Sequence, residues 1–151
     1  QESRGLGDVY KRQITVTALP EPVLFKETNK LYRKEEPWGY EIIWAQNTGT
    51  SGYIARHLHI IKGRQLPLQY HEEKEEAIYV ISGSLLFITK GTVSKPKKHE
   101  IAEILKAGDS REIPVGLIHR LAAGTRSVDL IKISTKHLDT GVTVQGSYER
   151  E

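Results

Sequence analysis

The sequence predicts an all-β domain of the sandwich or jelly-roll kind. Short segments rich in β-branched and aromatic residues recur along the chain, such as AIYVIS at residues 77–82. Turn signals separate these segments, and none shows a convincing long helical period, although residues 101–106 are ambiguous. Many short strands with regular turns are typical of a sandwich or jelly roll.

The expected strands follow one another from residue 40 onwards. We expect them at residues 40–45, 52–61, 66–71, 77–82, 85–90, 100–105, 111–113, 119–122 and 129–134. Glycines Gly63 and Gly83 bracket the third and fourth strands, and we expect tight turns with positive φ there.

Length and composition indicate one ordinary domain. The 151 residues suffice for a single hydrophobic core, and no cysteine is present, which excludes disulfides and thiolate metal sites. Residues 1–13 lack apolar periodicity, so we expect a non-native or disordered leader there and a single domain over residues 14–151. No apolar signal-peptide core or membrane-spanning run is found, so we expect a cytoplasmic protein that does not bind membranes.

The charge pattern argues against nucleic acid as a partner. The net charge is +3, but acidic and basic residues are interleaved throughout. The only dense basic cluster comprises Lys95, Lys97 and Lys98, and we expect it at a loop tip between two strands. Nucleic acid is therefore not an expected partner.

Two separated segments carry the residues of a candidate mononuclear metal site. Side chains alternate across a strand, so Gln69 and His71 point to the same face. Glu76 follows a polar bend, and we expect a hairpin to return it beside His71. Downstream, a Pro-x-Gly turn precedes His119, which supplies a second imidazole.

The candidate ligands suit a range of divalent ions. Two imidazoles and a carboxylate leave coordination positions open and suit iron, manganese, cobalt, nickel or zinc. The amide oxygen of Gln69 favours the harder octahedral ions slightly, and the identity of the metal stays open. His57 and His59 form a rival His-x-His pair, but no carboxylate follows at the needed offset, so we interpret them as structural or pocket-lining.

These spacings resemble the two motifs of the cupin superfamily. The first motif, Gly, His-x-His, Glu and Gly, is matched from Gly63 to Gly83 with Gln69 in the place of the first histidine. The second, Gly, Pro-x-Gly and His, is matched from residue 108 to His119. The resemblance implies a cupin-type jelly-roll barrel, a double-stranded β-helix, and a homodimer.

A narrower resemblance is to the cupin domain of type II mannose-6-phosphate isomerases and mannose-1-phosphate guanylyltransferases. PWGYE at residues 37–41, LQYH at 68–71, VISG at 80–83 and IPVGLIHRL at 113–121 carry it. It implies Gln69, His71, Glu76 and His119 as ligands of one divalent metal ion.

The chain departs from that family where a sugar phosphate would be handled. A histidine run followed by Arg is replaced by Glu72, Glu73 and Lys74 after His71. Glu73 is a candidate catalytic base, and Lys74 a candidate phosphate contact acting as a point charge. Arg120 follows His119 directly, so alternation is expected to turn it to the opposite face.

The leading functional hypothesis is a metal-dependent sugar-phosphate isomerase that interconverts an aldose and a ketose, in carbohydrate metabolism. Two alternatives stay open. One is an iron-dependent dioxygenase, because two histidines and a carboxylate form the facial triad of such enzymes. The other is a non-enzymatic sugar-binding or sensory module that keeps the metal for ligand capture.

Overall fold

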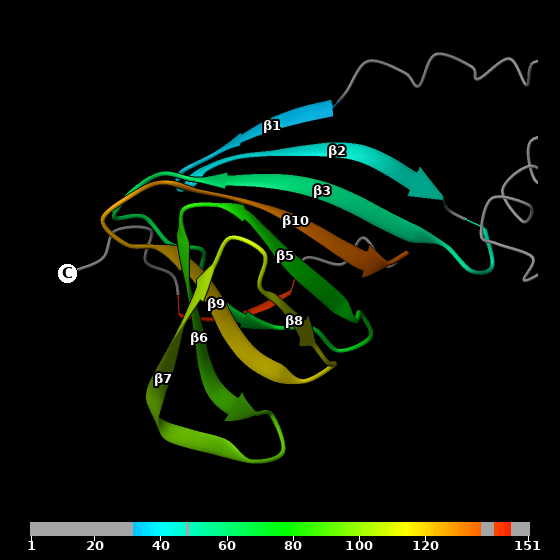
Figure 1. Ribbon diagram of the computed structural model, residues 1–151. Coiled ribbons are helices and arrows are strands. Elements are labelled where there is room, and N and C mark those ends of the chain that lie inside the picture. Colours follow the sequence, from blue (N-terminus) through cyan, green and yellow to red (C-terminus); the bar gives the residue numbers. More distant parts are fainter. Residues whose placement is uncertain (1–31, 48, 137–140, 146–151) are drawn as a thin grey trace, which may run out of the picture. The chain divides into compact units, whose positions relative to one another are not determined.

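Eleven strands and no helix make up the part of the chain that the computed structural model describes, residues 32–47, 49–136 and 141–145 (Figure 1). All of these residues fall within one compact unit, residues 31–151. The leader expected at residues 1–13 lies outside the described residues. The all-β prediction is confirmed.

The strands form two antiparallel sheets. The six-stranded sheet follows the order β1 (Tyr32–Glu36), β2 (Gly39–Asn47), β3 (Tyr53–Ile60), β10 (Val128–Thr135), β5 (Glu76–Ser82) and β8 (Ser110–Ile113). The five-stranded sheet follows the order β11 (Val142–Gln145), β4 (Leu68–Tyr70), β9 (Leu117–Ala123), β6 (Ser84–Thr92) and β7 (Pro96–Lys106). In Figure 1, β2, β3, β10 and β5 lie side by side, and β9, β6 and β7 form the second layer.

The hydrophobic core lies between the two sheets. Along β5 buried and exposed residues alternate, so that Ile78 and Val80 point inward and Tyr79 points outward. The inward side chains of the first sheet meet Leu85 and Leu121 of the second in one cluster. Each such side chain contributes about 1.5–3 kcal/mol on burial, so the core holds the sheets face to face.

Each of the nine expected strands is present, with shifted ends, and β1 and β11 are additional. The ambiguous residues 101–106 are strand, because they pair with β6. Lys97 and Lys98 lie within β7 and not at a loop tip, so that part of the prediction was wrong. A bulge near Gly91 carries the β6–β7 ladder on to Pro96, which leaves a tip of only three residues, 93–95.

The turns at two predicted glycines are confirmed. Gly63 has φ of 72° and Gly83 has φ of 81°, both in the left-handed region. At Gly83 a Cβ atom would also lie 2.4 Å from the carbonyl oxygen of Ser127. A side chain at Gly83 would therefore be both strained and obstructed.

The expected hairpin between residues 66–71 and 77–82 is absent. β4 pairs with β9 and β11 in one sheet, whereas β5 pairs with β10 and β8 in the other. The connection through residues 71–75 therefore crosses from one sheet to the other. This crossing determines how the candidate ligands meet.

Candidate metal centre

Three of the four predicted ligands converge between the sheets. His119 lies on β9, His71 follows β4 directly, and Glu76 is the first residue of β5. Gln69 on β4 is the direct register partner of His119, which brings the two histidine-bearing segments together. The sheets thus supply the histidines from one side and the carboxylate from the other.

The ligand atoms lie close enough to share one ion. Those of His71, Glu76 and His119 all lie within 4.8 Å of one another. Oε2 of Glu76 is 3.3 Å from Nε2 of His71 and 3.8 Å from Nε2 of His119. Both histidines are 2% exposed and Glu76 is 4% exposed, so the cluster is buried.

The hydrogen bonding of this cluster is incomplete. Both ring nitrogens of His71 and both carboxylate oxygens of Glu76 are buried without a hydrogen bond of good geometry among the described residues, although Oε1 of Glu76 forms ion pairs with two lysines. Such groups are costly unless something satisfies them. A divalent cation would accept electron pairs from one His71 nitrogen and from Glu76, and two imidazoles with a carboxylate are a common donor set for such ions. The residues therefore fit a metal ion.

His119 is held in the form that binds metals. Its Nδ1 lies 2.9 Å from the carbonyl oxygen of Leu117, to which the N–H donates, and this leaves Nε2 directed at Glu76. Burial lowers the pKa of His119 to about 4, although the bond to Leu117 and the charge of Glu76 act in the opposite direction. The imidazole is therefore neutral near pH 7.

Glu76 stays ionised despite its burial. Desolvation alone would raise its pKa, but the charge of Lys132, together with His71 and Lys74, holds the pKa well below its usual range. Nζ of Lys132 is 3.1 Å and Nζ of Lys74 is 3.4 Å from Oε1, whereas Oε2 faces the histidines. Only one oxygen of the carboxylate is thus directed at the candidate metal position.

Gln69 lies on the same cavity wall as His71. A Cβ atom at Gly141 would come within 3.0 Å of the Gln69 amide oxygen and 2.8 Å of Cε1 of His71. Gly141 therefore provides the space in which both side chains sit. Gln69 stays the predicted fourth ligand.

A cavity of about 440 Å³ reaches the cluster at His71, the one member of the cluster in its lining. Its lining includes His71 and Gln69, and its charged members are Lys34, Glu36, Glu41, Arg56, Lys74 and Lys132. Lys74, the predicted phosphate contact, is buried in this wall. Glu73, the predicted base, is exposed and does not belong to the lining. Sequence reasoning missed Lys132 and Arg56.

The rival histidines lie elsewhere. His57 and His59 both contact Oδ1 of Asp129, at 2.8 Å and 2.9 Å, and Tyr40 stacks on His59. They alternate with the inward residue Leu58, so they occupy the outer face of the sheet. One ring nitrogen of each histidine thus contacts Asp129, away from the metal cluster.

Arg120 points away from His119, as alternation predicts. It forms an ion pair with Glu100 of β7 and does not line the cavity. Its side chain is nevertheless buried.

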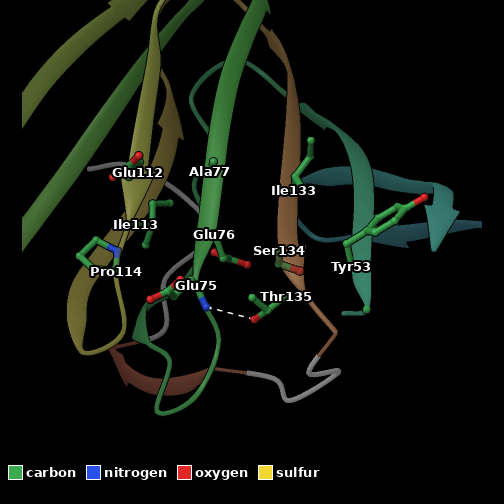
Figure 2. Close-up of a pocket in the computed structure, with 11 residues that line it drawn as sticks. Tyr53, Glu75, Glu76, Ala77, Glu112, Ile113, Pro114, Ile133, Ser134 and Thr135 are labelled. Atoms are coloured by element: carbon green, nitrogen blue, oxygen red, sulfur yellow. Dashed lines mark hydrogen bonds between the residues drawn. The ribbon is translucent and has the colours of Figure 1, made fainter. Parts of the chain in front are cut away.

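A second cleft, of about 420 Å³, lies where β5 begins and where β8 and β10 end (Figure 2). Ala77, Ile133 and Tyr53 line it, and the backbone N–H of Glu75 donates to the Thr135 hydroxyl at 3.3 Å. Glu75 and Glu112, which line the cleft outside the metal cluster, are exposed. No Lys or Arg contributes to the lining. Glu76 of the metal cluster and Ser134, which are both buried, line this cleft as well, so it differs from the first cavity in carrying no cation of its own.

The fold and the cluster together define a jelly roll with a candidate metal centre. The chain matches the cupin family over residues 40–147, and it belongs to that family. No curated protein sequence matches it. Among the described residues no helix is long and apolar enough to cross a membrane.

Solved structures share the fold. The chain is similar to the capsular polysaccharide assembling protein CapF from Staphylococcus aureus, at 15% identity and a TM-score of 0.65, with 78% of this chain and 35% of CapF covered. Oxalate decarboxylase from Bacillus subtilis, a protein with Mn(II) centres, is similar at 15% identity and a TM-score of 0.62, with 78% of this chain and 31% of the enzyme covered. KdgF from a Halomonas species is similar at 18% identity and a TM-score of 0.58, with 72% of this chain and 88% of KdgF covered.

These similarities establish the jelly-roll fold. The chain spans about a third of the length of CapF and of oxalate decarboxylase. The narrower resemblance to mannose-6-phosphate isomerases stays a prediction.

Proposed function

We propose that the chain is a metal-dependent isomerase that interconverts the aldose and ketose forms of a small sugar phosphate. The observation that carries the proposal is the buried cluster of His71, Glu76 and His119, of which His71 also lines a cavity with several cationic side chains. With Gln69, these residues would hold one divalent ion. Such an ion, when bound, supplies a Lewis acid that polarises a carbonyl or hydroxyl oxygen.

The chain's own residues bind and orient the substrate. A cavity of about 440 Å³ is in the range of small-molecule sites. Lys74 and Lys132 line it, and their positive charges would attract an anionic part of the substrate. Lys74 keeps the role of phosphate contact that the sequence predicts.

Isomerisation also requires a base that moves a proton between neighbouring carbons. Glu73 is exposed, so it would reach a bound substrate only after residues 72–75 rearrange. Glu41 lines the cavity and lies 3.6 Å from Arg56. We therefore propose Glu41 as a second candidate base beside Glu73.

The structural neighbours support a small-molecule ligand. Oxalate decarboxylase acts on a small dicarboxylate, and CapF is a capsular polysaccharide assembling protein. Both uses are compatible with a cavity that holds an anionic or sugar-like molecule.

A non-enzymatic, metal-dependent sugar-binding module is the second candidate. The exposed position of Glu73 favours it, because the predicted base then lies away from the ligand. Such a module would bind a sugar phosphate without converting it.

Turnover separates the two candidates. Protein purified without added metal is first analysed for its metal content and then assayed with mannose 6-phosphate and fructose 6-phosphate. We expect interconversion that stops on chelation and returns with the metal. The control variant His57→Ala should keep this activity, because His57 contacts Asp129 and lies outside the cluster. Binding without turnover in metal-loaded protein would favour the binding module. Oxygen uptake after anaerobic iron loading would favour the dioxygenase.

A further inference from the structure

The β6–β7 hairpin ends in an exposed and positively charged tip. Residues 93–95 form this tip, and Lys95, Lys97 and Lys98 are exposed on it or just after it, with no ion pair among the described residues. Val93 is apolar and yet 50% exposed. The tip therefore presents an apolar side chain beside several positive charges.

Hydrogen bonds hold the backbone of the tip in place. The N–H of Lys95 donates to the carbonyl oxygen of Thr92 at 3.1 Å, and the N–H of Thr92 donates to the carbonyl oxygen of Lys95 at 3.2 Å. The N–H of Val93 donates at 2.9 Å to the carbonyl oxygen of Gly116, in the turn between β8 and β9. A partner that binds such an ordered tip loses little conformational entropy.

The second cleft has a complementary composition. Ala77 and Ile133 are register partners on the outer face of the six-stranded sheet, and both are exposed. Figure 2 shows Glu112 on one side of Ala77 and Tyr53 on the other. The carboxylates of Glu75 and Glu112 have no ion pair among the described residues. An apolar side chain flanked by lysines thus matches the cleft in polarity and in charge.

The tip and the second cleft adjoin on one molecule. Val93 is bonded to Gly116, and Pro114, two residues earlier in the same turn, lines the cleft. No residue of the tip lines this cleft, so the tip does not fill the cleft of its own molecule. A two-fold axis that passes between two adjoining surfaces brings each of them onto the other surface of a second copy. Such an assembly is closed and contains two identical contacts.

We propose that the tip of the β6–β7 hairpin docks into the second cleft of another copy of this chain, and that the two copies exchange their tips reciprocally. Val93 contacts the apolar surface at Ala77 and Ile133, and the lysines of the tip face the carboxylates at the rim of the cleft. The inference goes beyond the proposed function, because it requires neither a metal nor a substrate. It assigns contact surfaces to the homodimer that the sequence leads us to expect.

A dimer formed through the apolar sheet faces alone is the competing explanation. Tyr79 and Ile81 are also exposed on the outer face of β5, and such a dimer would bury them without using the tip. The two explanations agree on the number of copies. They differ on electrostatics, since only a docked tip makes the dimer depend on the charges of the tip and of the cleft.

The first measurement is sedimentation velocity of the full chain over a range of concentrations, at low and at high salt. We expect a dimer whose dissociation constant rises at least about tenfold at high salt, because exposed ion pairs are screened. A monomeric parent protein, or an assembly larger than a dimer, would overturn the proposal.

Charge reversal assigns the contact to the two surfaces. The tip variant combines Lys95→Glu with Lys97→Glu. The cleft variant combines Glu75→Lys with Glu112→Lys. Each variant alone places like charges opposite each other, so we expect its dimer to weaken at least about tenfold. An equimolar mixture places opposite charges together at both contacts, so we expect a dimer that contains one copy of each variant.

A matched control changes the same number of charges elsewhere. Lys62→Glu combined with Lys106→Glu reverses two exposed lysines outside the tip and the cleft, and this variant should dimerise like the parent protein. Circular dichroism establishes that each variant is folded before it is mixed. If the cleft variant does not fold, the tip variant and Val93→Asp, which puts a carboxylate among those of the cleft, decide the question. A dimer that is unchanged in these variants, or folded variants that do not pair on mixing, would place the interface elsewhere and defeat the inference.

Discussion

Acidification of the metal-free protein is expected to destabilise it through His119. The folded protein holds the pKa of this histidine at about 4, against an ordinary value of 6.5. Between pH 6.5 and pH 4, His119 is protonated in the unfolded chain but stays neutral in the folded protein. The free energy of unfolding therefore falls as the pH falls from about 6.5 to 4. A pKa difference of this size corresponds to about 3 kcal/mol.

The assay is urea unfolding at several pH values between 7 and 4, in the presence of a chelator. His119→Gln removes the titrating group and keeps a polar side chain, so it is the reference protein. We expect the stability advantage of the parent protein over this variant to shrink by about 3 kcal/mol across the range. Glu76 acts in the same direction below its ordinary pKa of 4.5, and it does so in both proteins. Parallel stability curves for the two proteins would refute the reasoning.

Three further outcomes are expected. His71→Ala and His119→Ala should remove most of the metal measured by elemental analysis, whereas His57→Ala should leave it unchanged, because His57 contacts Asp129 on the outer face. Gly141→Ala should weaken metal binding and cost about 1–3 kcal/mol of stability in urea unfolding, because the new Cβ would lie 2.8 Å from the His71 ring. The protein should be a homodimer by light scattering, and Ile133→Asp should make it monomeric, because Ile133 lies among exposed apolar side chains on the outer face of β3, β5 and β10.

Each of these outcomes has a control or a contrary result. Equal metal content in the three histidine variants would defeat the ligand assignment. Gly124→Ala is the control for Gly141, since a Cβ at Gly124 would meet nothing within 4 Å. A monomeric parent protein would contradict the dimer, which the family resemblance and the exposed apolar residues Tyr53, Tyr79, Ile81 and Ile133 lead us to expect.

Strand periodicity predicted which side chains share a face. It predicted that Gln69 and His71 share one face and that Arg120 faces away from His119. It also predicted that His57 and His59 lie on one face of their strand. Period two is a property of one strand, and local sequence suffices to read it. Both motif spacings are also local, which is why the sequence could single out His71, Glu76 and His119, which the fold brings together.

Pairing between strands was harder to predict. The polar residues between His71 and Glu76 suggested a hairpin, but they cross between sheets, because the partners of β4 and β5 are distant in sequence. Lys132 and Arg56 were missed for the same reason. Each lies at an inward-facing position of a strand whose other inward residues are mostly apolar, and this pattern is visible in the sequence. Their meeting depends on the β3–β10 register.

The origin of the candidate ligands has a mechanical consequence. Glu76 belongs to one sheet and His119 to the other, with His71 following a strand of that second sheet. An ion held by all three would cross-link the two sheets, and the sheets could separate there only after the ion is released. At a hundred times its dissociation constant, free metal would add about 2.7 kcal/mol to the folded state. Slow amide hydrogen exchange at this end of the barrel would then report occupancy without any substrate.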